Sequence, residues 1–168
     1  MKNSTTMPSP LATPNLLGME AASAISAAIN PLVADSFALY VKSKNFHWHL
    51  SGPHFRDYHL MFDEQADQIF AMIDVLAERV RKLGGTTIHS ISHISQLQNI
   101  KDDNQAFVEA KEMIQILLND NKNFAQRMRD AHKICDDCGD VATASFLEVF
   151  IDETERRTWF LYETSVNS

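Results

Sequence analysis

The chain has 168 residues, of which 45% are apolar and only five each are glycine and proline. This length supports one domain with a substantial core, and so few turn residues disfavour an all-β fold. With 15 basic and 22 acidic residues, the net charge of −7 argues against a general affinity for nucleic acid. The same charge suits a protein that attracts cations.

The first residues, MKNSTTMPSPLATPN, contain one lysine and no apolar stretch, so they do not match a secretory signal. Ser, Thr, Pro and Asn dominate them, and we expect residues 1–16 to form a flexible tail before a single domain over 17–168. The sequence has no run of 18 apolar residues that would predict a membrane span. We therefore expect a cytoplasmic protein with no membrane partner.

An amphipathic helix is predicted first, because apolar residues recur at spacings of three and four over residues 25–44. Pro31 interrupts this pattern. Either Asn30 caps a helix that begins at Pro31, or one helix continues with a kink there.

The rest of the chain predicts three more long helices and one short one, at about residues 54–83, 90–97 (short), 104–132 and 141–164. Phe107 is expected on the inner face of the helix over 104–132. The first two long helices are joined tightly, as are the last two, and a long crossover separates the pairs. This connectivity is typical of the all-α, ferritin-like four-helix bundle.

Two cysteines, Cys135 and Cys138, form a single C-x-x-C pair. One chain cannot build a four-cysteine zinc site from them, and no βαβ redox unit surrounds them. We interpret them as reduced thiols at a helix start.

Histidine and carboxylates share one face of the helix predicted over 54–83. His59 and Asp63 are four residues apart, as are Asp74 and Glu78, so each pair meets one turn apart on the helix surface. Asp63 and Asp74 lie on the same face, but roughly 16 Å apart at about 1.5 Å per residue. No single metal site spans that distance.

Two copies of this helix, crossing antiparallel about a two-fold axis, would join the pairs. Both pairs have the same midpoint, so one axis sets Asp63 opposite Asp74 and His59 opposite Glu78 of the second copy. Each half-site is then completed by the other chain. By contrast, the sequence lacks the Glu-x-x-His pattern of a di-iron centre closed within one bundle.

A further imidazole is available where the first helix ends, at His47 or His49. These residues are two apart and point away from each other on a helix, so at most one faces the His59–Asp63 pair. Two imidazoles with three carboxylates suit Fe(II), Zn or Mn, and carboxylates also hold Fe(III), which favours oxidation over mere binding.

Simpler interpretations exist for each group. Asp74 and Glu78 could form a solvated face with Arg79 and Arg81 as salt-bridge partners. The spacing of His89 and His93 also suits a metal, but without a nearby carboxylate we interpret them as structural or surface residues.

The chain resembles the Dps family, the mini-ferritins. The resemblance lies in His47-Trp48, Gly52, Phe55, the spacing His-x11-His-x3-Asp-x10-Asp-x3-Glu, the AER at 77–79 and Gly84-Gly85, and it extends over about residues 20–164. It implies a homododecamer that oxidises Fe(II) with hydrogen peroxide or oxygen and stores ferric iron, with no organic cofactor. It also implies that His47, His59 and Asp63 of one chain join Asp74 and Glu78 of another, with Trp48 beside the site.

The acidic cluster Asp136, Asp137 and Asp140 resembles in placement the acidic three-fold pore of that family. The alternative is a helix N-cap with acids that complement the helix dipole.

DNA binding is where the sequence departs from the family pattern. Only Lys2 is basic in residues 1–16, and the final ETSVNS has no basic residue. Direct DNA binding, with nucleoid association, is therefore doubtful and is kept as the alternative function. A shell with no redox role is a third possibility.

Overall fold

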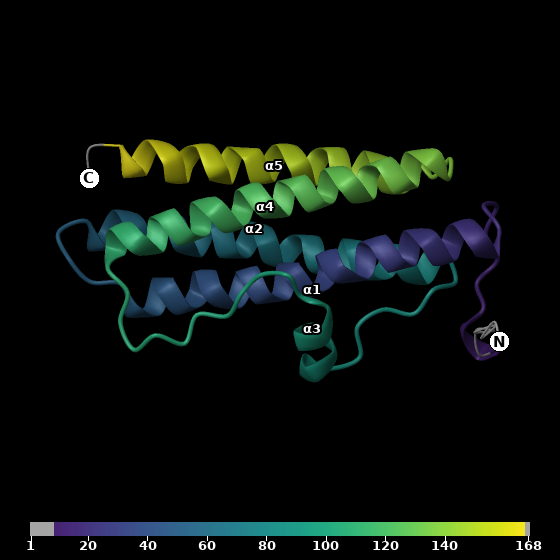
Figure 1. Ribbon diagram of the computed structural model, residues 1–168, viewed down its shortest axis with the longest axis horizontal. Coiled ribbons are helices and arrows are strands. Elements are labelled where there is room, and N and C mark those ends of the chain that lie inside the picture. The colour runs from purple at the N-terminus through teal and green to yellow at the C-terminus, as the bar shows by residue number, and fades with distance from the viewer. Residues whose placement is uncertain (1–8, 167–168) are drawn as a thin grey trace.

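The structure is a computed structural model, and it describes residues 9–166. These residues form helices joined by loops, with no strand. The elements are η1 (Ser9–Leu11), α1 (Met19–His49), α2 (Phe55–Lys82), α3 (Ile91–Leu97), α4 (Ala110–Asp137) and α5 (Val141–Ser165). Helices α1 and α2 form one antiparallel pair, α4 and α5 form the other, and the segment between α2 and α4 carries α3 past α1 (Figure 1). The predicted ferritin-like bundle with a long crossover is confirmed.

Helix α1 continues through Pro31, so the prediction of one helix holds and that of a cap at Asn30 does not. The Asn30 side chain instead donates a hydrogen bond to the Thr86 carbonyl oxygen at 2.9 Å. Pro31 has no N–H for the helix ladder, a loss of about 3 kcal/mol. Burial of the neighbouring Ile29 and Leu32 offsets this cost.

Among the described residues, α1 is long and apolar enough to cross a membrane by length and composition alone. Its buried residues pack in the core of the bundle, mainly against α2 and α4. The apolar character of α1 is thus that of a core helix.

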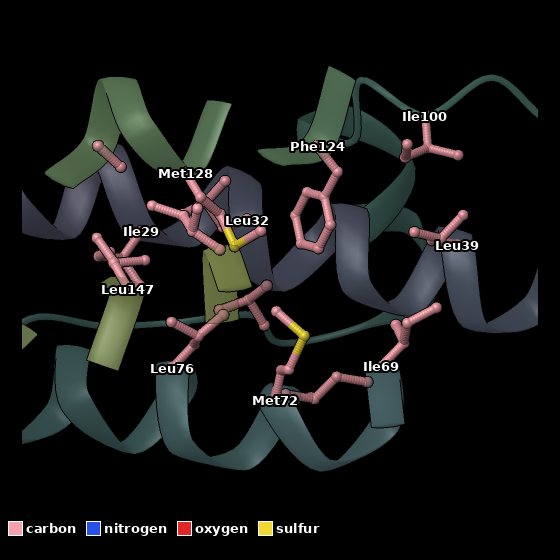
Figure 2. Packing of buried hydrophobic residues seen from close by; sticks show 14 of the residues in the cluster. Ile29, Leu32, Leu39, Ile69, Met72, Leu76, Ile100, Phe124, Met128 and Leu147 are labelled. Carbon is pink, nitrogen blue, oxygen red and sulfur yellow. The ribbon is translucent and has the colours of Figure 1, made fainter. Parts of the chain in front are cut away.

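The core lies between the two helix pairs. Large apolar side chains from α1, α2, α4 and α5 meet there, and each contributes roughly 1.5–3 kcal/mol when fully buried. Figure 2 shows Ile29, Leu32, Leu39, Ile69, Met72, Leu76, Phe124, Met128 and Leu147, with Ile100 of the crossover beside them.

Helix α4 begins and ends later than predicted. It starts at Ala110 rather than near 104, so Phe107 lies in the crossover with 55% of its surface exposed, and Val108 is buried instead. At the other end α4 continues past Cys135 to Asp137, and Cys138 is its C-cap residue. Gly139 ends it with φ 73°, a left-handed conformation that glycine adopts without a steric penalty.

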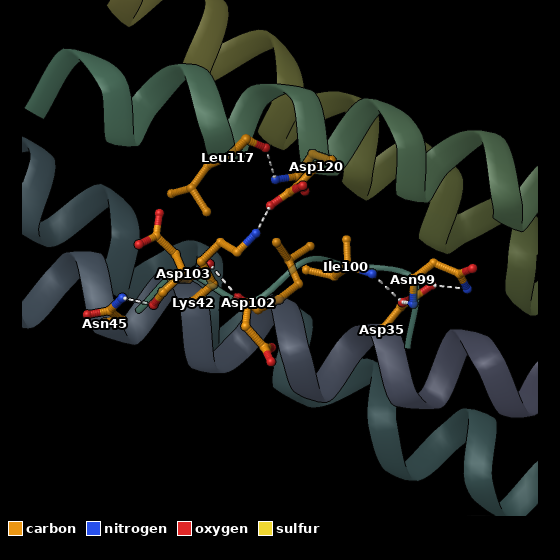
Figure 3. Close-up of polar contacts among 12 residues, drawn as sticks. Asp35, Lys42, Asn45, Asn99, Ile100, Asp102, Asp103, Leu117 and Asp120 are labelled. Atoms are coloured by element: carbon orange, nitrogen blue, oxygen red, sulfur yellow. Dashed lines mark hydrogen bonds and ion pairs between the residues drawn. The ribbon is translucent and has the colours of Figure 1, made fainter. Parts of the chain in front are cut away.

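Largely buried charges tie both the crossover and α4 to α1 (Figure 3). The Asp35 carboxylate is fully buried and accepts hydrogen bonds from the backbone N–H groups of Asn99 and Ile100 and from Arg127 Nε. Lys42 of α1 pairs with Asp120 of α4 at 2.5 Å. These contacts fix the register of α1, the helix that supplies His47.

The described part of the predicted tail contacts the end of α2. Asn15 Nδ2 donates to the Leu83 carbonyl at 3.0 Å, and Arg81 Nη2 donates to the Leu11 carbonyl at 2.9 Å. Residues 1–8, including Lys2, lie outside the described residues.

Candidate metal centre

Two histidines meet where α1 ends and α2 begins. The rings of His47 and His59 stack with centroids 3.7 Å apart. His47 Nδ1 lies 2.8 Å from the His59 carbonyl oxygen, and His59 Nδ1 lies 3.0 Å from the His47 carbonyl oxygen. A carbonyl oxygen only accepts, so both Nδ1 atoms carry the proton, and in the neutral form of each ring Nε2 keeps a lone pair. This is the tautomer in which imidazole binds a metal through Nε2.

Asp63 lies one turn after His59 and adds a carboxylate to the same cluster. Its Oδ1 is 3.8 Å from His47 Nε2 and accepts a hydrogen bond from Lys44 Nζ. The hydrogen bond from Lys44 is the main reason why the pKa of the Asp63 carboxyl lies below its usual value, and the nearby imidazoles lower it further. Asp63 is therefore ionised at neutral pH, as a metal ligand must be.

Lys44 is the neighbour that the sequence interpretation missed. It sits three residues before His47, on the same face of α1, and the pKa of its ammonium is raised, chiefly by Asp63. Its ammonium is paired with the Asp63 carboxylate, the group that a metal cation would bind. The spacing of Lys44 and His47 was the available signal.

One aromatic ring contacts the histidine pair. Phe55 stacks on His59 with centroids 4.9 Å apart. Trp48 follows His47 and is 65% exposed. His49 is also exposed, and its Nδ1 lies 2.9 Å from the Asn45 carbonyl oxygen, away from this cluster. Only one of the two neighbouring histidines thus faces His59, as predicted.

Asp74 and Glu78 lie further along α2, and both are exposed. Glu78 makes an i,i+4 ion pair with Lys82 at 3.2 Å, both side chains being more than half exposed. Within the described part of one chain, no three His, Cys, Asp or Glu residues are grouped closely enough to hold a metal ion. One chain therefore does not assemble a metal site from the five predicted ligands: His47, His59 and Asp63 lie where α1 meets α2, and Asp74 and Glu78 lie further along α2.

The three acidic residues predicted to line a pore differ in how exposed they are. Asp140 is only 2% exposed, caps α5 through the Thr143 N–H at 3.1 Å, and pairs with Arg79 Nη2 at 2.6 Å. The capping alternative therefore describes Asp140. Asp136 and Asp137 are exposed, and Asp137 pairs with Lys133 at 2.8 Å.

The two cysteines are free thiols, but their predicted position at a helix start is wrong. Cys135 lies in the last turn of α4 and Cys138 at its C-cap, because the helix continues to Asp137 before Gly139 ends it. Burial raises the pKa of the Cys135 thiol to about 12. Cys135 is therefore protonated at neutral pH and serves as an apolar core residue.

His89 and His93 form a local contact at the start of α3. Their rings stack at 5.5 Å, and the His89 N–H donates to His93 Nδ1 at 3.3 Å. The Ser90 side chain caps the same helix through the His93 N–H. A structural role accounts for this pair.

Comparisons with known proteins show the family of the chain. A family model described as a ferritin-like domain matches residues 26–167. An uncharacterised low temperature-induced protein of Nostoc is 35% identical over 134 residues, which cover 79% of this chain and 75% of that protein. A DNA protection during starvation protein of Brevibacillus brevis is 32% identical over 137 residues, covering 82% of this chain and 91% of that protein.

One solved structure is a Dps protein of Vibrio cholerae, described as a member of a broad superfamily of ferritin-like diiron-carboxylate proteins. It superposes with a TM-score of 0.83 at 27% identity and covers 90% of this chain and 96% of that one.

Proposed function

Because this chain belongs to the Dps family of ferritin-like proteins, we propose that it is a ferroxidase that oxidises Fe(II) at sites shared by two subunits. The ferric product is stored inside a hollow homododecamer. This removal of iron from solution protects against oxidative damage. Hydrogen peroxide is the proposed oxidant, with oxygen as the alternative. Iron is both the substrate and the only cofactor in this proposal.

The observation that carries the proposal is the state of the first half-site. His47 and His59 each donate the Nδ1 proton to the other's backbone carbonyl, so the neutral form of each ring offers its Nε2 lone pair to a metal, and Asp63 nearby is ionised. Nitrogen and carboxylate oxygen together suit a first-row divalent metal such as Fe(II).

The second half-site comes from the partner in this proposal. The pairs 63/74 and 59/78 share one midpoint, so a two-fold axis there brings each half-site to the other chain's complement. Phe70, near this midpoint, is 54% exposed, an apolar side chain that a second α2 would cover.

The reaction needs little from the chain beyond binding and charge. Two Fe(II) ions lose one electron each, and hydrogen peroxide takes both as its O–O bond breaks, leaving two hydroxide ions. The imidazoles hold the incoming Fe(II), while the carboxylates of Asp63, Asp74 and Glu78 stabilise the added positive charge of Fe(III).

The direct test is Fe(II) oxidation by the purified assembly, with peroxide and with oxygen in separate runs, alongside light scattering for the mass. We expect oxidation by the wild-type dodecamer and its loss in Asp63→Asn. Asp130→Asn is the matched control, because Asp130 is an exposed carboxylate on α4 that accepts a hydrogen bond from Gln126. Equal rates for Asp63→Asn and the control would refute the ferroxidase proposal.

DNA compaction is the second candidate, and the name of the Brevibacillus relative favours it. The net charge of −7 per chain opposes it, because binding to phosphates needs basic residues. We expect no gel shift of linear duplex DNA by the metal-free assembly at physiological salt. Tight, salt-sensitive binding that disappears on deletion of residues 1–16 would support DNA compaction instead.

A further inference from the structure

Asp67 is a carboxylate on α2 that the proposed ferroxidase site does not use. It lies one turn after Asp63, is exposed, and makes no ion pair within the described part of the chain. The ion pair at this level of the bundle joins Lys44 of α1 to Asp63, and the Lys44 side chain is 17% exposed. Lys44 thus holds a carboxylate that the metal needs, while a second carboxylate lies one turn away.

Two contacts between α1 and α2 lie on either side of Asp67. Tyr40 packs on Phe70 with ring centroids 5.0 Å apart. Lys44, one turn after Tyr40, reaches Asp63. Residues 63, 67 and 70 share one face of α2, so Asp67 lies between these two contacts. Asp63 and Asp67 are about 6 Å apart along the helix axis, a distance that a lysine side chain covers by changing rotamers.

The charge of Asp67 already acts on Lys44. The pKa of the Lys44 ammonium is raised first by its hydrogen bond to Asp63, and the charge of Asp67 raises it further, while burial acts in the opposite direction. Asp67 is therefore an electrostatic partner of Lys44 even while the hydrogen bond goes to Asp63.

The proposed two-fold axis gives Asp67 a need for a cation. The midpoint that pairs 63 with 74 also pairs 67 with 70, so Asp67 lies opposite Phe70 of the partner subunit. Phe70 is 54% exposed in one chain and would cover this carboxylate in the assembly. A carboxylate that loses its hydration under an apolar ring is strongly stabilised by a neighbouring positive charge. Lys44 can supply that charge from the same chain.

We propose that Lys44 moves from Asp63 to Asp67 when Fe(II) binds, so that the incoming metal replaces an ammonium. This exchange rests on the proposed ferroxidase function and names how the chain's own cation leaves that site. Before Fe(II) binds, Lys44 balances the charge of Asp63. Once the metal is bound, like charges repel at short range, and the ammonium needs another carboxylate. Lys44 thus has a partner in both states.

A double-mutant cycle with Co(II), an air-stable substitute for Fe(II), tests the exchange on the assembled protein by calorimetry. Asp67→Asn should weaken Co(II) binding by about two- to five-fold, the scale of a partly exposed ion pair. Glu64→Gln is the control, because Glu64 is an exposed carboxylate of the same helix that lines the hollow between α2 and α5. In a Lys44→Met background, Asp67→Asn should weaken binding no more than Glu64→Gln does.

The cycle separates the exchange from a general effect of charge. Equal losses from Asp67→Asn in both backgrounds would mean that Asp67 attracts the metal by charge alone, which overturns the exchange. Equal losses from Asp67→Asn and Glu64→Gln with Lys44 present would overturn it too. A wild-type assembly that binds no Co(II) would refute the proposed ferroxidase site as well, whereas Co(II) binding without coupling refutes the exchange alone.

Crystals of the wild-type assembly, with and without Co(II), give a readout that needs no variant. We expect Lys44 Nζ within hydrogen-bonding distance of Asp63 in the metal-free crystal and of Asp67 in the loaded one. A loaded crystal in which Lys44 stays on Asp63, or points to solvent away from both carboxylates, would contradict the proposal.

Discussion

The two ends of the ligand face on α2 differ in how much of their geometry one chain fixes. At the first end, His59 is locked to His47 by stacking and by two reciprocal hydrogen bonds, and Lys44 holds Asp63. At the second end, Asp74 and Glu78 are exposed, and the contact that holds Glu78 is a surface ion pair with Lys82.

This difference suggests that the two half-sites have different roles, one in binding the metal first and the other in completing the site between two chains. Side chains held by packing and hydrogen bonds are already arranged for a ligand. These side chains therefore lose little conformational entropy when they bind a metal. Exposed carboxylates on a helix surface contribute to a metal site only when a second chain brings its ligands next to them. The first half-site should therefore set recognition, and the second should act through the partner chain.

The largest effect is expected from the first half-site. His59→Ala removes an Nε2 ligand and the ring that stacks on His47, so Fe(II) oxidation should fall by at least about 100-fold. His49→Ala is the matched control, since His49 is exposed two residues from His47 and bonds only within α1. Stopped-flow oxidation rates on assemblies of confirmed mass measure both. Equal losses in the two variants would contradict the assignment.

A smaller loss is expected at the second half-site. Glu78→Gln should lower the oxidation rate by about 10- to 100-fold. Its free energy of unfolding should change by less than about 1 kcal/mol, because the Glu78–Lys82 pair is exposed. Glu155→Gln, which alters a surface ion pair with Arg129, is the control. A Glu78→Gln protein with the wild-type rate would leave only the solvated-face interpretation.

Lys44 sharpens the comparison because it competes with a metal for Asp63. Lys44→Met should tighten Fe(II) binding by roughly two- to five-fold near neutral pH, the scale of a partly exposed ion pair. Asp63 is needed in its ionised form, and Lys44 keeps its pKa low. Without Lys44 that pKa rises, so the acid limb of the pH–rate profile should move to higher pH. An unmoved acid limb would show that Asp63 does not control it.

The smallest effect is expected at the acidic cluster, where Asp140 is buried and Asp136 and Asp137 are exposed. Asp136→Asn with Asp137→Asn should slow initial iron uptake by about two- to three-fold at low ionic strength, where electrostatic steering is strongest. Asp140 stays unchanged, because it caps α5 and pairs with Arg79. An initial uptake rate equal to that of the wild type would remove the pore role.

The long helices were predictable where breakers mark their ends. Gly52-Pro53 and Gly84-Gly85 limit α2, and its predicted bounds are within one residue of Phe55–Lys82. Helix α4 was predicted poorly because residues 104–109 fit the apolar pattern yet are held in the crossover. Its other end was misjudged because only Gly139, after the two cysteines, stops the helix.

The site was predictable only in its spacing. The four-residue repeats identify a shared face of α2, but they do not show that reciprocal Nδ1 hydrogen bonds orient the rings of His47 and His59. They also miss Lys44, because a lysine on an amphipathic helix is usually interpreted as solvated. Asp140 shows the opposite error, since an acid within an acidic cluster is buried by Arg79 and Thr143.

The shared site is tested most directly by mixing two inactive chains. His59→Ala and Glu78→Ala subunits are dissociated, combined in equal amounts and reassembled, with mass tags to confirm mixing. At an interface between the two kinds, one site keeps every ligand, so about a quarter of all sites should be intact and activity should return to about that fraction. No recovery in confirmed mixed assemblies would contradict a site built from two subunits.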